Sequence, residues 1–129
     1  MSMSTSGRGD AGLFDRQAVL RRLGGDEKLL GKLVEAYAKD IPLLLGRLRE
    51  AVSACDVRAV SFHACSVKGA SLAVGAFAIH GLAVEIDRHA RIHGVVTAAD
   101  SVNRLGEAFD AFLSVARGSR AKPDLNAVG

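Results

Sequence analysis

A cysteine and a lysine stand one helical turn apart near the middle of the chain, at Cys65 and Lys68. A thiolate is a nucleophile, and a neighbouring cation favours this form of the thiol. The pair could therefore accept a phosphoryl group, undergo oxidation or lie inert on a surface. His63 precedes Cys65 by two residues, which places it about 160° around a helix. We expect His63 to be a partly buried packing residue that faces away from Lys68.

Two further histidines, His89 and His93, are four residues apart on one predicted helix. This spacing can hold a metal ion, with Glu85 or Asp87 nearby. Positive charge near the C-terminal end of a helix is favourable in its own right. We therefore expect no metal site and no cofactor, and we interpret the histidines as complementing the helix dipole.

Composition and charge exclude several classes of protein. The 17 basic residues are interspersed with 14 acidic ones, for a net charge of +3, so we expect no nucleic-acid partner. No apolar run approaches the roughly 18 residues of a membrane span, and residues 1–12 lack the apolar core of a signal peptide. We expect a cytoplasmic protein with no membrane partner. Cys55 and Cys65 are expected to be free thiols, because the chain shows no export signal.

Helix-forming residues dominate the chain, and apolar residues recur at three- and four-residue spacings. Asp15, Asp26 and Asp56 each precede such a segment and are predicted N-caps, while Gly75 and Gly94 are predicted helix ends. The expected helices cover residues 16–23, 26–54, 57–74 and 76–93, with a fifth starting near residue 97.

These segments predict an all-α fold. Four amphipathic helices with short connections pack most simply as an antiparallel four-helix up-down bundle, with the short extra N-terminal helix covering one end. The predicted domain spans residues 13–117. Residues 1–12 are polar and rich in serine and glycine, and residues 118–129 read GSRAKPDLNAVG; both stretches are expected to be disordered tails.

The predicted helix at 57–74 has two unlike faces. Its core side carries Val60, Val67, Ser71 and Val74. The opposite side carries Arg58, Ser61, Phe62, Cys65, Lys68, Gly69 and Leu72. Glycine costs a helix about 1 kcal/mol relative to alanine, and exposed apolar side chains mark docking surfaces. The pattern leaves two readings open: a docking patch, or residues that pack under a neighbouring loop.

The same stretch resembles the histidine-containing phosphotransfer (HPt) domains of bacterial multistep phosphorelays, whose central motif reads approximately A-H-x-L-K-G-S-x-x-x-x-G-A. Residues 64–76 read ACSVKGASLAVGA. Downstream, the family's spaced apolar residues, acidic residue and Ala-Arg pair are matched by Ile79, Leu82, Ala83, Ile86, Asp87, Ala90, Arg91 and Gly94. The departure is at Cys65, which stands three residues before Lys68, where the family has its phosphorylated histidine.

The resemblance implies a two-component signalling module, not an enzyme, that binds the receiver domain of a response regulator or of a hybrid sensor kinase. It further implies that Phe62, Cys65, Lys68, Gly69 and Leu72 form the docking face, and that Cys65 occupies the phosphoacceptor position without carrying phosphate. One alternative is an active phosphocarrier that uses Cys65, or a protein whose natural histidine was replaced there. Another is a helical adaptor that binds its partners through a different face.

Overall fold

The computed structural model describes residues 12–128, and the side chains of residues 12–118. Throughout the described residues the regular structure is helical, which confirms the all-α class. The helices are α2 (Arg16–Arg22), α3 (Glu27–Ser53), α4 (Val57–Val74), α5 (Phe77–Ile92) and α6 (Val95–Val128). The tail predicted at residues 1–12 lies, up to residue 11, outside the described part of the chain.

Aspartate side chains begin three of these helices, as predicted. In each case the carboxylate accepts a hydrogen bond from the backbone N–H three residues further on, which satisfies a donor that has no partner within the helix. The bonds run to Asp15 from Ala18 at 3.1 Å, to Asp26 from Leu29 at 3.0 Å and to Asp56 from Ala59 at 3.0 Å.

The break between α4 and α5 depends on Gly75. Its φ of +76° is in the left-handed region that side chains disfavour. A Cβ placed there would come within 2.7 Å of Val19 Cγ2 and 3.0 Å of the Asp15 carbonyl oxygen. The Gly75 carbonyl in turn accepts a 2.9 Å hydrogen bond from the Asp15 backbone N–H. The α4–α5 turn is therefore locked against the start of α2.

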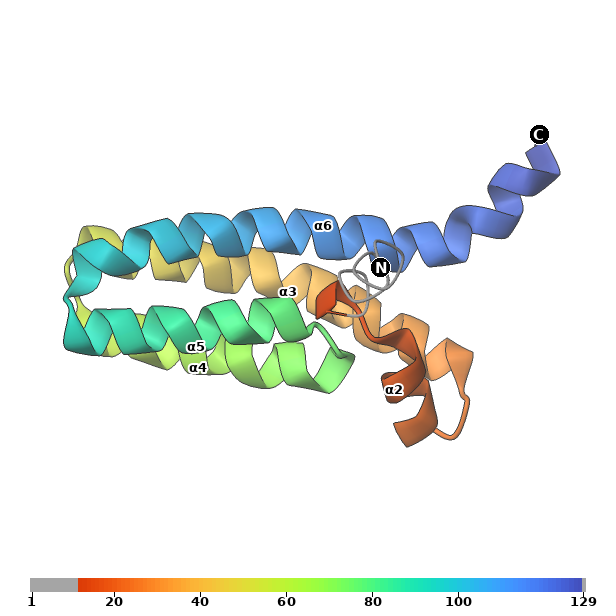
Figure 1. The fold of residues 1–129 in the computed structure, drawn as a ribbon, viewed down its shortest axis with the longest axis horizontal. Helices are drawn as coiled ribbons and strands as arrows, with labels where there is room; N and C mark the ends of the chain where they lie inside the picture. The colour runs from red at the N-terminus through yellow and green to blue at the C-terminus, as the bar shows by residue number, and fades with distance from the viewer. Residues whose placement is uncertain (1–11, 129) are drawn as a thin grey trace, which may run out of the picture.

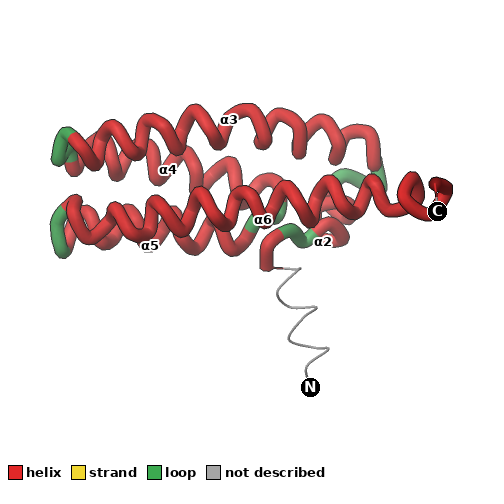
Figure 2. The backbone as a smooth tube through the Cα atoms, turned by 90° about the horizontal axis from the view of Figure 1, so that it is seen from above, coloured by secondary structure: helices red, strands yellow, loops and turns green. Residues whose placement is uncertain are grey.

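The long helices pack side by side as a bundle. α4 packs on α3 and α5, and α6 packs on α5 and α3, while the short α2 contacts α3 and α4. Figure 1 shows α2 beside one end of this arrangement, and the view from above in Figure 2 shows the four longer helices running along a common direction. Only two residues, Gly75 and Ala76, separate α4 from α5.

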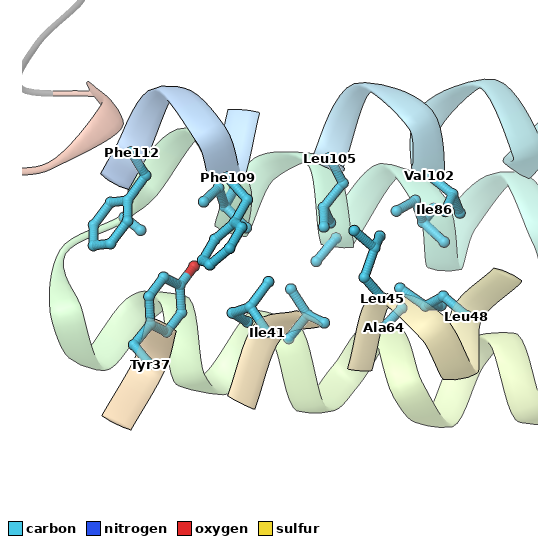
Figure 3. Close-up of a cluster of buried hydrophobic side chains, with 14 of the residues drawn as sticks. Tyr37, Ile41, Leu45, Leu48, Ala64, Ile86, Val102, Leu105, Phe109 and Phe112 are labelled. Carbon is cyan, nitrogen blue, oxygen red and sulfur yellow. The ribbon is translucent and has the colours of Figure 1, made fainter. Parts of the chain in front are cut away.

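The core is aliphatic along most of its length and aromatic near one end (Figure 3). Tyr37 of α3 meets Phe112 of α6 with ring centroids 5.0 Å apart, and Phe112 meets Phe14 at 5.3 Å. Both contacts are edge-to-face, which is the favoured arrangement for aromatic pairs. Because Phe14 precedes α2, this cluster joins the N-terminal segment to α3 and α6.

The last helix differs most from its predicted extent. It begins at Val95, two residues before the expected start near residue 97, and it continues to Val128 through the range predicted as a disordered tail. Among the residues whose side chains are described, buried residues continue along it to Ala116. Among residues 12–128, no helix combines the length and apolar character needed to span a bilayer.

Candidate functional site

Five residues of α4 form a surface of mixed character, which we call the α4 outer face: Phe62, Cys65, Lys68, Gly69 and Leu72. Phe62 is 68% exposed and Leu72 is 48% exposed. Cys65 and Gly69 are exposed between them, and Lys68 is partly exposed. Within residues 12–118 no loop covers Phe62 and Leu72, which contradicts packing under a neighbouring loop for these two side chains.

No packing contact within the described part of the chain requires a glycine at position 69. Apart from its own helix backbone and chain neighbours, no described atom lies within 4 Å of the position that a Cβ would take. Gly106 of α6 differs, because a Cβ there would lie 3.2 Å from an Arg49 guanidinium nitrogen. An alanine at position 69 would fit and would favour the helix. The open surface beside Cys65 is therefore available for close approach by another molecule.

The inner side of α4 is as predicted. Val60, Val67 and Ser71 are fully buried, and Val74 is nearly so. These residues hold the helix in one rotational setting, because turning α4 would expose the valines and bury charged groups. The orientation of the α4 outer face is thus fixed by the core behind it.

Ser61 is the exception to the predicted facing of α4. It was expected on the outer side, but it is partly buried and its hydroxyl donates a hydrogen bond to the Asp87 carboxylate of α5. The second Asp87 oxygen pairs with Arg91 at 3.1 Å. Helical periodicity places Ser61 about 40° from Cys65, on the predicted outer side. The packing of α5 against α4, which periodicity does not give, is what partly covers it.

His63 lies where the sequence predicts, partly buried at the side of α4. Its ring meets Phe62 edge-to-face with centroids 5.3 Å apart. The Nδ1 atom is buried and has no hydrogen-bond partner among the described residues. The His63 ring therefore packs against the Phe62 ring at the side of α4, while Cys65 and Lys68 lie on the outer face.

His89 and His93 stack edge-to-face on α5 with ring centroids 5.7 Å apart. Across residues 12–118, no group of three or more His, Cys, Asp and Glu side chains is placed to hold a metal ion. Glu85, the carboxylate one turn before His89, is bonded to residues of α6. It accepts a 2.6 Å hydrogen bond from the Ser101 hydroxyl and pairs with the Arg104 guanidinium at 2.6 Å. The Ser101 hydrogen bond, with Arg104 and His89 also contributing, lowers the pKa of Glu85.

The C-terminal end of α4 is tied to α2. The Arg22 guanidinium donates a 3.0 Å hydrogen bond to the Ala73 carbonyl oxygen. The last carbonyls of a helix lack partners within the helix and carry partial negative charge, so a cation is stabilising there. This contact was not predicted from the sequence, because it joins residues 51 positions apart.

The charge of α4 is of one sign. Residues 57–74 include Arg58 and Lys68 but no aspartate or glutamate. Cys55 and Cys65 are both exposed free thiols, as predicted. The α4 outer face therefore combines exposed apolar area, an accessible nucleophile and positive charge around an open glycine.

Comparison of this chain with family models, with curated proteins and with solved structures gives no match. The case for a function therefore depends on the α4 outer face and the helices that hold it.

Proposed function

We propose that this protein is an HPt-like signalling module that docks receiver domains and does not carry phosphate. Its fold would be the antiparallel up-down four-helix bundle of that family, with α2 as the short extra helix. The observation that carries the proposal is the open glycine, Gly69, one turn from Cys65 and flanked by the exposed Phe62 and Leu72.

Apolar exposure supports docking. A 68% exposed phenylalanine and a 48% exposed leucine, almost three turns apart on one helix, are costly to leave in water unless a partner covers them. Gly69 lies between them, so a partner's backbone can approach α4 without meeting a side chain. Aromatic and aliphatic anchors around a gap are the arrangement that concentrates binding energy in an interface.

Charge supports a receiver as the partner. By resemblance to the family, a receiver presents an acidic phosphorylation pocket, and Lys68 would lie opposite it. With no carboxylate in α4, nothing on that helix repels such a pocket. The side-by-side packing of α3, α4, α5 and α6 supports the proposed bundle, because each of these helices packs on two others.

The proposed loss of phosphotransfer follows from the chemistry of Cys65. A thiol at the acceptor position changes the bond length and the leaving group that a receiver aspartate must match, although docking needs neither. If Cys65 does take phosphate, the protein is an active phosphocarrier, and intact mass spectrometry after mixing with phosphorylated receivers detects the adduct.

Receiver binding tests the proposal directly. A panel of purified receiver domains is titrated into the protein, each with and without beryllofluoride, and the dissociation constants are measured. We expect at least one in the roughly micromolar range typical of transient signalling contacts. Gly69→Gln should weaken that binding at least about tenfold by filling the gap. Gly46→Gln is the matched control, because Gly46 is also an exposed helical glycine without described neighbours around a Cβ.

A helical adaptor is the second candidate, and one observation favours it. Leu43 on α3 is 64% exposed and lies one turn from the open Gly46. If Gly46→Gln abolishes binding of a partner while Gly69→Gln does not, the α3 surface is the docking site. Binding that is lost only in Gly69→Gln excludes that candidate.

A further inference from the structure

Exposed apolar residues continue from α4 onto α5. Phe77 and Val84 are 39% and 41% exposed, and Gly81 lies between them at spacings of four and three residues. We call these three residues the α5 flank. As at Gly69, no described atom other than its own helix backbone and chain neighbours lies within 4 Å of a Cβ built at Gly81. α5 thus repeats the pattern of two apolar side chains around an open glycine.

A hydrogen bond sets the register between the two helices. The Ser61 hydroxyl of α4 donates to the Asp87 carboxylate of α5, so these two residues lie at the same level. Because only residues 75 and 76 join the packed helices, α4 and α5 run in opposite directions. Val84 is three residues before Asp87, and Cys65 is four residues after Ser61. These offsets place Val84 level with Cys65.

Counting residues from the same Ser61–Asp87 bond also aligns Gly81 and Phe77 of α5 with residues of α4. Gly81 is six positions away along α5, and Gly69 is eight positions away along α4. Phe77 and Leu72 are ten and eleven positions away. With a rise of about 1.5 Å per residue, each pair is level to within about 3 Å. The two glycines therefore lie at similar levels on neighbouring helices, and Leu72 and Phe77 lie at similar levels beyond them.

The unpaired charges on this stretch of α4 and α5 are positive. Lys68 and Arg88, four residues beyond Val84, have no ion-pair partner among the described residues. The nearest α5 carboxylate, Asp87, is bonded by Ser61 and paired with Arg91. A surface of this kind attracts an acidic partner and repels a basic one.

We propose that the α5 flank is the second half of the docking face and that it contacts the same acidic receiver surface as α4. This inference rests on the proposed function and specifies its interface. Specific interfaces take about 20–30 residues from each side. Five residues of one helix fall well short of that size, and the α5 flank adds exposed apolar side chains at matching levels on the neighbouring helix. The receiver would then bind across two helices, and some of its interface residues would contact Phe77 and Val84.

Charge variants at Val84 test this proposal. Val84→Asp and Val84→Lys both remove apolar contact but introduce opposite charges. Against an acidic receiver surface, we expect Val84→Asp to weaken binding at least about tenfold and Val84→Lys much less. Gly81→Gln should weaken binding as Gly69→Gln does. Val96→Asp, on α6 and 79% exposed, and Gly46→Gln are matched controls that should bind within about twofold of the parent protein.

The measurement is the dissociation constant for the receiver that the parent protein binds, with circular dichroism to verify that each variant is folded. If both Gly81→Gln and Val84→Asp bind like the parent while Gly69→Gln does not, docking is confined to α4, and this inference is wrong although the proposed function stands. If Val84→Asp and Val84→Lys weaken receiver binding equally, the proposal that the partner surface is acidic is wrong. If no receiver binds the parent protein, both proposals fail together.

Discussion

The hydroxyl groups of Tyr37 and Ser71 lie 2.6 Å apart in the interior and join α3 to α4. Ser71 is fully buried, and it lies two residues from Gly69 on the opposite side of the helix. Burial raises the pKa of Tyr37, so its phenol stays protonated and remains able to donate. This buried polar contact therefore ties the inner side of α4, opposite its exposed face, to α3.

Removing one partner of that bond should destabilise the fold. Tyr37→Phe leaves the Ser71 hydroxyl buried without its partner, and we expect a loss of about 1–3 kcal/mol in the free energy of unfolding. The double variant Tyr37→Phe/Ser71→Ala should lose less than the sum of the single changes, because neither polar group then remains unpaired. Urea denaturation of the four proteins measures the coupling. Strictly additive losses would contradict a direct interaction.

Substitutions on the two sides of α4 should differ sharply. Val67→Asp places a carboxylate without a partner in the core, and we expect a loss of several kcal/mol and failure to fold. Cys65→Ser changes an exposed side chain two residues away and should alter stability by no more than about 0.5 kcal/mol. Thermal unfolding of both variants is the measurement, and a parent-like melting temperature for Val67→Asp is incompatible with its buried position.

Two glycines of the same helix region should respond in opposite ways to alanine. Gly69→Ala meets no described atom outside its own helix and should stabilise the protein by about 0.5–1 kcal/mol. Gly75→Ala should destabilise it, because the left-handed backbone disfavours a side chain and the Cβ would meet Val19. Chemical denaturation ranks the two variants. Destabilisation by Gly69→Ala would show that this glycine serves the fold and not a partner.

Stability should fall in acid partly through Glu85. Its pKa is lowered in the folded state from an ordinary 4.5, chiefly by the Ser101 hydrogen bond. A lowered pKa contributes stability above the unfolded value and loses it as pH falls through the folded value. We expect Glu85→Gln to lose less stability than the parent between about pH 5 and pH 3. Urea midpoints at the two pH values decide this, and equal losses would contradict the prediction.

If the proposed docking face is present, a histidine introduced at position 65 should accept phosphate from a receiver. Cys65→His places an imidazole on the exposed side of α4, one turn from Lys68. Phosphoryl transfer depends mainly on positioning and charge stabilisation, so little else is needed. We expect acid-labile phosphate on this variant after mixing with a phosphorylated receiver that binds the parent. Adding Gly69→Gln should abolish the label, and labelling that survives this second change would place docking elsewhere.

Local signals were sufficient to predict most of the helix ends. An aspartate before three of the helices and a glycine after others act within a few residues, so Asp15, Asp26, Asp56, Gly75 and Gly94 could all be identified from the sequence alone. The buried side of α4 followed for the same reason, because three- and four-residue periodicity is a property of one helix. These features require no knowledge of neighbouring elements.

Relationships between helices could not be predicted in the same way. The Ser61–Asp87 bond, the Arg22–Ala73 contact and the Tyr37–Ser71 pair join positions 26 to 51 residues apart. Their formation depends on the register and distance of packed helices, which periodicity leaves undetermined. The α5 flank was missed for this reason: Phe77, Gly81 and Val84 gain a meaning only when α5 is aligned with α4.

The order in which the helices pack has a consequence for the speed of folding. The principal contacts of α4 are with α3 and α5, its neighbours in the chain, and α5 packs on the helix that follows it. The closure of α6 on α3 and the contacts of α2 and of the segment before it bring distant segments together. Proteins whose contacts are mostly local fold in about microseconds to milliseconds, since little chain entropy is lost before contacts form. Refolding of this protein should therefore be fast, with closure of α6 on α3 as its slowest helix-pairing step.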